Sequence, residues 1–176
     1  MLTTRRWERI IVVAALVLIL ALVNWSIWSK ERHLAEGEVV FLELAPVDPR
    51  SLMQGDYMAL RFALANRVWS ARYASAGSER DVADGYVIVR LDAQRVGHFA
   101  RLGSPAAALA EGEMLLHYRL RNGQVQFATD AFFFQEGHAE RYEPARYGQF
   151  RVNEKGEPLL VALHDAGLER LGNMER

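Results

Sequence analysis

The chain has 176 residues, enough for one domain with a short accessory segment, and its formal net charge is −1. Hydrophobic residues make up 51% of the sequence, and their excess lies in the first thirty residues. The mildly acidic remainder lacks the basic surface that nucleic-acid binding requires, so we expect no nucleic acid as a partner. The chain has no cysteine, which excludes disulfides, Cys-ligated zinc, iron–sulfur clusters and cysteine nucleophiles.

The first element predicted by the sequence is a membrane-spanning helix. Every residue from Ile10 to Val23 is apolar, and only Asn24 and Ser26 are polar between there and Trp28. A helix over residues 10–28 would be about 28 Å long, close to the roughly 30 Å thickness of the hydrocarbon core. Tryptophans lie near both ends of this stretch, where interfacial indole rings are favoured. We therefore expect residues 10–28 to contact membrane lipid.

The same segment predicts how the chain is oriented. Residues 26–35 offer no pair of small residues at the spacing a signal peptidase requires, which favours an uncleaved signal anchor over a cleaved signal peptide. A buried soluble helix would rarely be apolar on every face. Three arginines precede the helix, whereas Lys30 and Arg32 follow it, so the N-terminus is expected in the cytoplasm. The sequence thus predicts a single-pass protein of the inner (plasma) membrane.

This orientation divides the chain into three parts. Residues 1–29 are interpreted as a cytoplasmic stub and the anchor, residues 30–37 as a polar tether, and residues 38–176 as a periplasmic or extracellular β-rich domain. Alternation of apolar and polar residues predicts strands over residues 39–44, 57–64, 86–91, 114–121, 124–129, 131–135, 147–152 and 159–164.

Turns and two short helices complete the predicted domain. Asn122-Gly123 suits the two positive φ angles of a type I′ hairpin turn, and residues 153–156 join the last two strands. Helices are expected over residues 66–74 and from Ser104 through Glu111, where Ser104 would be the N-cap. The predicted fold class is mainly β (α+β), a mostly antiparallel barrel or sandwich-like domain with one or two short helices.

A first group of candidate site residues lies between residues 46 and 62, which contain two turn signals. In the structural interpretation, Gly55-Asp56 makes a turn into the following strand, and the Asp56 carboxylate bonds its own backbone. In the functional interpretation, Arg50, Asp56 and Tyr57 form the rim of a binding pocket, where loops hold polar groups on a rigid sheet.

Residues 55–62 read Gly-Asp-Tyr-Met-Ala-Leu-Arg-Phe and resemble the motif for which the GDYXXLXY protein family is named. Gly55, Asp56, Tyr57 and Leu60 match that motif, whereas Phe62 replaces its final tyrosine, keeping the ring and losing the hydroxyl. Residues 132–148 also resemble the family's C-terminal half, and the resemblance covers about residues 10–168. It implies a multi-pass membrane protein as a partner, because members are often found beside such proteins. It implies no particular reaction.

A second group of candidate residues follows the strand predicted over residues 131–135. If that strand continued, Glu136, His138 and Glu140 would share one face, and a histidine between two carboxylates could ligate zinc or act as a general base. In the alternative, Gly137 breaks the strand and these are solvated loop side chains. The lone histidine favours the loop, and we expect neither a bound metal nor another cofactor.

The next residues, Arg141, Tyr142, Arg146 and Tyr147, interleave cations with aromatic rings. They could clamp a carboxylate or phosphate of a ligand by bidentate hydrogen bonds. Surface ion pairs between the arginines and neighbouring glutamates would explain the same residues without any ligand.

Three functions are compatible with these patterns. The first is a membrane-anchored accessory or binding module that acts with a partner membrane protein. The second is an envelope hydrolase or metal-dependent enzyme that uses His138, Glu136 and Asp56, although the chain lacks a Gly-x-Ser-x-Gly elbow, a phosphate-binding loop and a His-Glu-x-x-His pair. The third is a structural envelope protein that assembles as a homo-oligomer. The missing catalytic templates favour the first.

Overall fold

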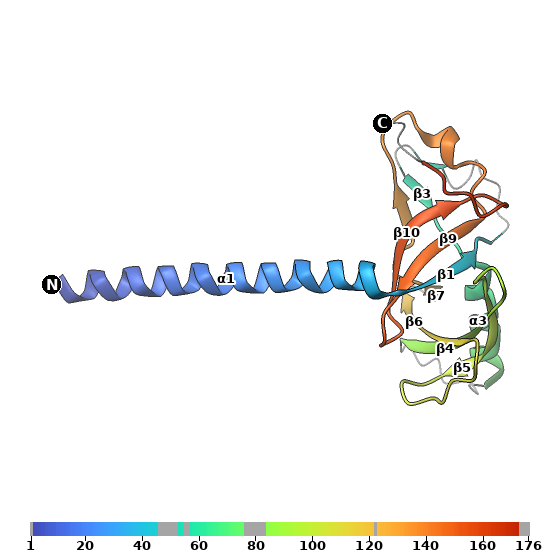
Figure 1. Ribbon diagram of the computed structural model, residues 1–176, viewed down its shortest axis with the longest axis horizontal. Coiled ribbons are helices and arrows are strands. Elements are labelled where there is room, and N and C mark those ends of the chain that lie inside the picture. The colour runs from blue at the N-terminus through green and yellow to red at the C-terminus, as the bar shows by residue number, and fades with distance from the viewer. Residues whose placement is uncertain (1, 46–52, 55–56, 76–83, 122, 173–176) are drawn as a thin grey trace. The chain divides into compact units, whose positions relative to one another are not determined.

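The computed structural model describes residues 2–45, 53–54, 57–75, 84–121 and 123–172, and within that part the side chains of residues 2–6, 8, 9, 53 and 54 are left aside. The chain forms two compact units, Met1–Glu36 and Gly37–Arg176. The first unit is a single helix and the second is built mainly of strands, and most of these elements are labelled in Figure 1.

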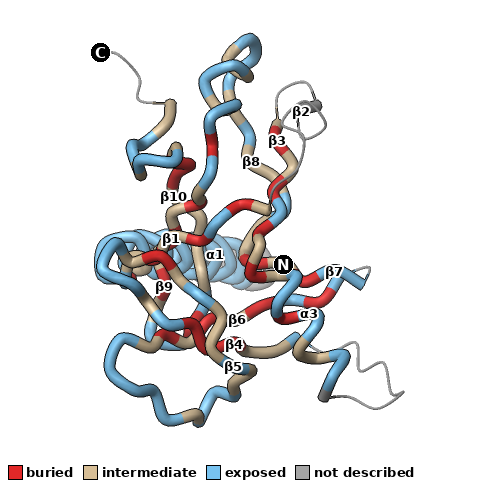
Figure 2. The backbone as a smooth tube through the Cα atoms, turned by 90° about the vertical axis from the view of Figure 1, so that its right-hand side faces the viewer, coloured by how far each residue is buried: buried red, intermediate tan, exposed pale blue. Residues whose placement is uncertain are grey.

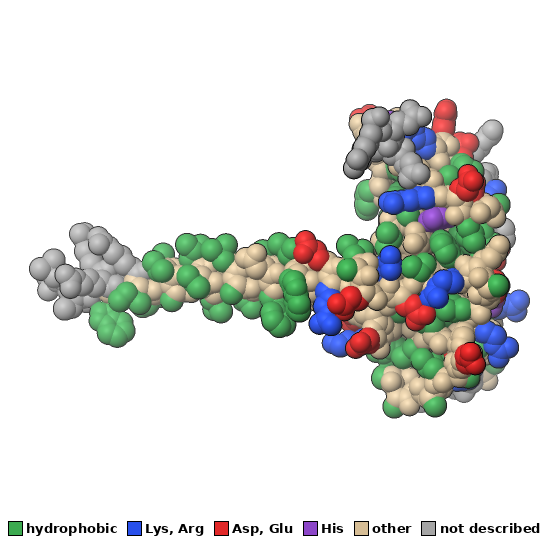
Figure 3. Space-filling model, in the orientation of Figure 1, with side chains coloured by type: hydrophobic (Ala, Val, Ile, Leu, Met, Phe, Trp, Pro, Cys, Tyr) green, Lys and Arg blue, Asp and Glu red, His purple; other side chains and the backbone are tan. Residues whose placement is uncertain are grey.

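Helix α1 runs without interruption from Leu2 to Glu36. Its Ile10–Glu36 part is long and apolar enough to cross a membrane, and none of the apolar stretch is buried in the protein. The side chains along most of its length are hydrophobic (Figure 3). The helix is longer than the segment expected from hydrophobicity, because residues 30–36, interpreted above as a tether, continue it. An Arg32–Glu36 ion pair of 2.7 Å, one turn apart, supports this polar extension.

The first sheet of the domain has the order β1-β9-β10 and is antiparallel throughout. Its strands are β1 (Glu38–Glu43), β9 (Tyr147–Val152) and β10 (Pro158–His164), and all three were expected from the alternating pattern. The turn between β9 and β10 depends on Asn153, whose Oδ1 accepts hydrogen bonds from the backbone N–H groups of Lys155 (3.0 Å) and Glu157 (2.9 Å).

The second sheet has the order β5-β4-β6-β7. Its strands are β4 (Gly85–Leu91), β5 (Gly97–Gly103), β6 (Glu113–Arg121) and β7 (Gln124–Gln126). The predicted β6–β7 hairpin is confirmed: Arg121 pairs with Gln124, and Gly123 has φ +73°. Asn122 lies outside the described residues, so the second positive φ of the expected type I′ turn stays a prediction. Strand β5 was not predicted.

The third sheet has the order β2-β3-β8 and consists of short strands, β2 (Met53–Gln54), β3 (Tyr57–Ala59) and β8 (Ala131–Phe133). The strand predicted over residues 57–64 was therefore too long, because it ends at Ala59 and helix α3 begins at Ala63 and runs to Ser75. The apolar row Met58, Leu60, Phe62 and Leu64 is nevertheless buried, with 3–5% of each residue exposed.

The helix expected from Ser104 to Glu111 is absent from the described structure, where these residues form turns and irregular chain. Backbone groups of this segment bond to side chains of the neighbouring strands instead. The Arg101 side chain donates a hydrogen bond to the carbonyl of Ala108, and the Ala110 N–H donates one to the Glu113 carboxylate. Leu109 is 46% exposed, so this alanine-rich segment has no apolar face to bury. Among the described strands the sheets are open, so of the two expected architectures, a barrel or a sandwich-like domain, the closed barrel does not form.

The core of the domain lies between the sheets and α3. In Figure 2 the buried positions are concentrated on the strands, whereas α1 is exposed along its described length. The largest fully buried side chains come from β1, α3, β4, β6, β9 and β10 and from the segment after β7, and they are Phe127, Phe150, Leu42, Ile88, Leu116, Leu163, Val40, Val68, Val87 and Val89. This packing supplies the rigid support for the residues described next.

Candidate functional site

The described part of the motif, residues 57–62, lies where two sheets and α3 meet. Tyr57–Ala59 form strand β3 and pair with Phe133–Ala131 of β8. The Leu60 N–H then donates a hydrogen bond to the Asp130 carbonyl (2.7 Å), and the Arg61 carbonyl accepts one from the Ala45 N–H (2.7 Å). Phe62 forms an antiparallel bridge with Leu44 at the end of β1 and leads directly into α3.

The residues at the last two defined positions of the motif, Leu60 and Phe62, belong to the core. Leu60 is 5% exposed and Phe62 3%. The ring of Phe62 makes edge-to-face contacts with Phe150 (centroids 5.2 Å apart) and Phe127 (6.4 Å). Gly148 makes room for this ring, because a Cβ at that position would lie 2.9 Å from Phe62 Cε1. The aromatic ring therefore has a packing function here that needs no hydroxyl.

The polar first half of the motif is only partly described. Arg50, Gly55 and Asp56 lie outside the described residues, so their predicted places at a pocket rim stay predictions. Tyr57 is half-buried, and its ring lies 5.8 Å from that of Phe133, which is 74% exposed. The two rings lie on the opposite face of the sheet from Met58 and Phe132, because successive side chains of a strand point to opposite faces.

A groove with a volume of about 330 Å³ adjoins the end of the motif. One wall is formed by residues 59–62 and by Ala65, Asn66 and Trp69 of α3. The opposite wall is formed by residues 123–127 together with Thr129 and Asp130. The groove is therefore built by three elements that the motif itself brings together.

The groove has an apolar floor and a charged rim. Leu60, Phe62 and Phe127 are buried beneath it, whereas Trp69 is 43% exposed at its wall. Arg61 and Asp130 are exposed and supply opposite charges. The Asp130 carboxylate accepts a hydrogen bond of 3.1 Å from the Gln126 side chain, which fixes its position on the rim. Such a site suits an apolar side chain flanked by polar backbone.

The structure corrects the premise of the histidine–carboxylate hypothesis. Strand β8 ends at Phe133, Gly137 has φ +81°, and a short 3₁₀ helix, η1, follows over Ala139–Tyr142. Glu136, His138 and Glu140 therefore do not alternate along one strand. Among the described residues, no group of three or more His, Asp or Glu side chains could hold a metal ion. Any pairing of His138 with Asp56 lies outside the described residues.

Contacts among the described residues do not bring Arg141, Tyr142, Arg146 and Tyr147 together into a clamp. Tyr142 packs between aromatic rings, stacked on Phe134 with centroids 5.2 Å apart and tilted against Phe132 at the same distance. The Arg146 guanidinium donates a hydrogen bond to the Ala145 carbonyl (2.8 Å). The remaining two members are separate from these contacts: Arg141 is exposed on η1, and Tyr147 begins β9.

Two ion-paired carboxylates near β5 have perturbed pKa values, Asp92 with a side chain that is 40% exposed and Glu113 with one that is 4% exposed. The hydrogen bond from Arg101 lowers the pKa of Glu113 below its ordinary value, and the N–H of Ala110 adds to this effect. The hydrogen bond with His98 similarly lowers the pKa of Asp92, together with the N–H of Val96. Neither carboxylate lines the groove, so these shifts reflect structural ion pairs rather than a reactive site.

Sequence reasoning missed the wall residue Trp69 and the rim residue Asp130. Trp69 was assigned to a short helix without a role, and Asp130 lies between two predicted strands. A single large aromatic residue on a predicted helix is no signal by itself, because isolated hydrophobic residues are common on protein surfaces. The opposing Asp130 could not be found, since its place depends on a pairing of distant segments.

The comparisons with known proteins identify one family. The model of the family described as GDYXXLXY protein matches residues 19–163, which is most of the chain. The matched region includes the described motif residues, the groove and strands β1 to β9. No curated protein and no solved structure is similar enough to this chain to match it.

Proposed function

Because this chain belongs to the GDYXXLXY protein family, and its motif ends at the groove, we propose that it is a membrane-anchored binding module whose groove holds a segment of a partner membrane protein. The observation that carries the proposal is the groove itself, with its apolar floor, its exposed Trp69 and its rim of Arg61 and Asp130. Exposed aromatic residues beside buried apolar ones are typical of protein-binding surfaces.

The size of the groove favours a peptide segment over a whole small molecule. A volume of about 330 Å³ is at the lower end of the range for ligand pockets, and the groove is partly open to solvent. It can take one or two apolar side chains of an extended chain, while Arg61 and Asp130 bind that chain's carbonyl and N–H groups. An extended segment needs no enclosed cavity, because its backbone stays at the surface.

The membrane anchor supports a partner in the same membrane. In this proposal α1 is an uncleaved signal anchor, the N-terminus is cytoplasmic, and the sandwich-like domain lies in the periplasm or outside the cell. The basis for this orientation is the three arginines before the apolar stretch and the two cations after it. Anchoring both proteins in one membrane raises their effective concentration, so a small groove suffices for stable association.

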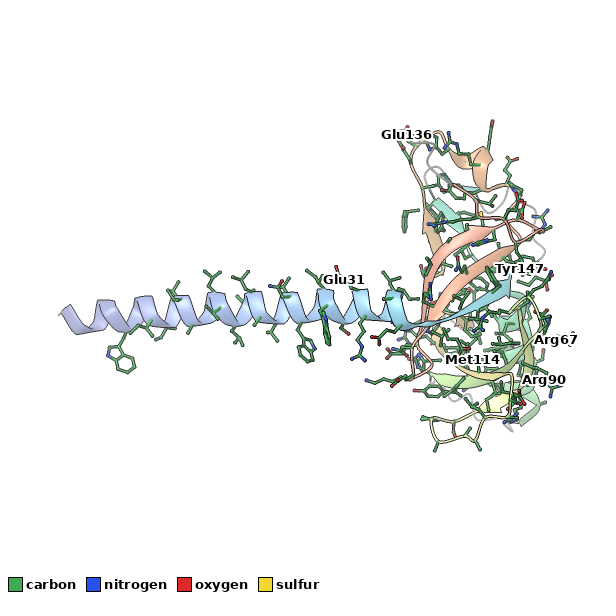
Figure 4. The ribbon with its side chains drawn as sticks, viewed as in Figure 1. Glu31, Arg67, Arg90, Met114, Glu136 and Tyr147 are labelled. Atoms are coloured by element: carbon green, nitrogen blue, oxygen red, sulfur yellow. The ribbon has the colours of Figure 1, made fainter. Side chains whose placement is uncertain are left out.

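Site-specific photo-crosslinking tests the proposal in native membranes. A photoreactive amino acid replaces Trp69 in the full-length chain, and a matched variant carries it at Arg67, which lies on the same helix, outside the groove and at the edge of the domain (Figure 4). We expect a discrete crosslinked membrane protein from position 69 only. Equal products from both positions, or none from position 69, would contradict the proposal.

A further inference from the structure

Helix α1 carries a stripe of side chains at heptad spacing that crosses the apolar segment and continues beyond it. Positions three and four residues apart lie on one face of a helix, and a repeat of seven residues keeps that face aligned between two supercoiled helices. The stripe, called the heptad face below, consists of Ile10, Val13, Val17, Leu20, Asn24, Ile27, Glu31 and Leu34. It covers more than three heptads without a break in the helix.

The strongest sign of a function is Leu34. Residues 29–36 are otherwise polar or small, yet Leu34 is 43% exposed on this extension and lies one heptad after Ile27 and two after Leu20. A membrane span alone gives no reason for a leucine at that place beyond the apolar segment. A second helix against the same face does, because it would bury Leu34 in line with the apolar residues before it.

Asn24 lies on the same face, within the apolar stretch. Its side-chain Nδ2 donates a hydrogen bond to the Leu20 carbonyl (2.8 Å) with one of its two hydrogens. Among the described residues its Oδ1 accepts no hydrogen bond and its second hydrogen has no acceptor. An amide both donates and accepts, so the Asn24 amides of two copies are complementary across a two-fold axis. Polar side chains of this kind hold membrane helices together.

The charged residues of the extension fit the same arrangement. Glu31, which projects from α1 near its C-terminal end in Figure 4, occupies the heptad face and follows Lys30 directly. In a parallel pair, the residue before a core position faces the core residue of the other helix, so Lys30 of one copy faces Glu31 of the other. Away from this face, Arg32 lies over the Trp28 ring (5.7 Å) and pairs with Glu36 within its own helix.

We propose that the α1 helices of two copies of this chain pair in parallel through the heptad face, with Asn24 fixing the register. Two copies of a single-pass protein share one orientation, which makes the pair parallel. Two of the four residues in one set of core positions are β-branched (Ile10, Val17), and two of the four in the other are leucine (Leu20, Leu34), the residue types that favour two strands at these positions. The seven-residue repeat itself gives a left-handed supercoil. The inference rests on α1 lying in a membrane and is independent of what the groove holds.

Disulfide crosslinking tests this directly, since the natural chain has no cysteine to give background products. Single cysteines replace Leu34 or Ile27 on the heptad face, and His33 or Ser29 off it, in the full-length protein. After oxidation in native membranes, we expect a species of twice the 20.0 kDa chain mass for the first two, at least about fivefold more than for the last two. Equal dimer yields at all four positions would refute the pairing, as would a product that contains a different protein instead of a second copy.

A second arm isolates Asn24. In the Leu34→Cys chain, Asn24→Leu is expected to reduce the dimer yield about threefold, because a hydrogen bond between membrane helices is lost. Ser26→Leu is the matched control, since it removes another polar group of the same stretch from the opposite side of the helix and should leave the yield unchanged. An equal fall in both variants would contradict the role of Asn24. Failure of the Trp69 crosslinking would leave these results unaffected, so the two proposals are tested separately.

Discussion

The Nε2 atom of His164 lies 2.9 Å from the side-chain amide of Gln149, and this hydrogen-bonded pair joins the end of β10 to the middle of β9. The other ring nitrogen, Nδ1, donates a hydrogen bond to the Leu168 carbonyl (2.9 Å), and the ring meets Phe41 edge to face at 5.1 Å. At 6% exposure, His164 is a buried polar residue of the described core. Through its contacts with Leu168 and Gln149, the ring connects the segment after β10 to the sheet.

The first prediction concerns this residue. His164→Ala should lower the free energy of unfolding by about 2–4 kcal/mol, because it leaves a cavity and deprives Gln149 and Leu168 of buried hydrogen bonds. The measurement is urea unfolding of the full-length chain in detergent, followed by the signal of the β domain. His138→Ala, at a half-buried histidine of the loop before η1, is the control and should change the midpoint little. A larger loss of unfolding free energy for His138→Ala than for His164→Ala would contradict this prediction, and His138 would then be tested again as part of the histidine–carboxylate hypothesis.

The second prediction compares two glycines with the same backbone conformation and different surroundings. Gly123 has φ +73° with nothing within 4 Å of an added Cβ, whereas Gly156 has φ +77° and a Cβ there would lie 2.9 Å from the Leu115 carbonyl oxygen. Gly123→Ala should cost about 1 kcal/mol of unfolding free energy from backbone strain alone. Gly156→Ala should cost clearly more, because the backbone of β6 must also shift. Equal losses of unfolding free energy in the two variants would contradict this, because they would mean that the backbone at Leu115 shifts without a cost.

The sheet elements were predictable where apolar residues alternate because one face is buried, as in β1, β6 and β9, and where consecutive apolar residues are buried on both faces, as in β4 and β10. Strand β5 was missed since its sequence, Gly97 to Gly103, alternates poorly and most of its residues are half-buried. It is an edge strand, held by its pairing with β4 rather than by an apolar face.

The change from strand to helix after the motif shows a different limit. Met58, Leu60, Phe62 and Leu64 repeat with period two, but Leu64 and Val68 also repeat with helical spacing, so the pattern permits both structures. The pairing of Leu60 with Asp130 and of Phe62 with Leu44 ends the strand where it does, and these are contacts between distant segments. The groove depends on the same contacts and was therefore beyond sequence reasoning.

The third prediction concerns pH. The unfolded chain titrates Glu113 and Asp92 near their ordinary pKa values of 4.5 and 3.8, whereas hydrogen bonds from Arg101 and with His98 lower both pKa values in the folded domain. Their contribution to stability is therefore fully present above about pH 4.5 and is lost as the pH falls through the folded values. Glu113→Gln should flatten the acid side of a plot of unfolding midpoint against pH. A slope identical to that of the natural chain would exclude this ion pair as a cause.

The fourth prediction concerns topology. A reporter active only outside the cytoplasm, fused after Arg176, should be active, because more positive charges precede the apolar stretch than follow it. Replacing Arg5 and Arg6 with glutamine leaves one cation before the stretch and two after it, which reverses the difference and should reduce the activity, measured per unit of fusion protein. A fusion active only in the cytoplasm would reverse the orientation, and a mature N-terminus near residue 36 would identify a cleaved signal peptide.

The last prediction distinguishes a turn residue from a reactive one at Asp56, where the sequence alone is the guide. If the carboxylate bonds its own backbone in the turn before Tyr57, Asp56→Asn should change neither the melting temperature nor the crosslinking yield from position 69, because an amide makes the same bond. If Asp56 is an acid, a base or a metal ligand, the substitution removes its charge and abolishes function in a folded chain. We expect the first result. A stable Asp56→Asn protein that gives no crosslinked partner from position 69 would identify Asp56 as the reactive residue of the motif. Asp56→Glu, which keeps the charge, would then give part of the natural crosslinking yield.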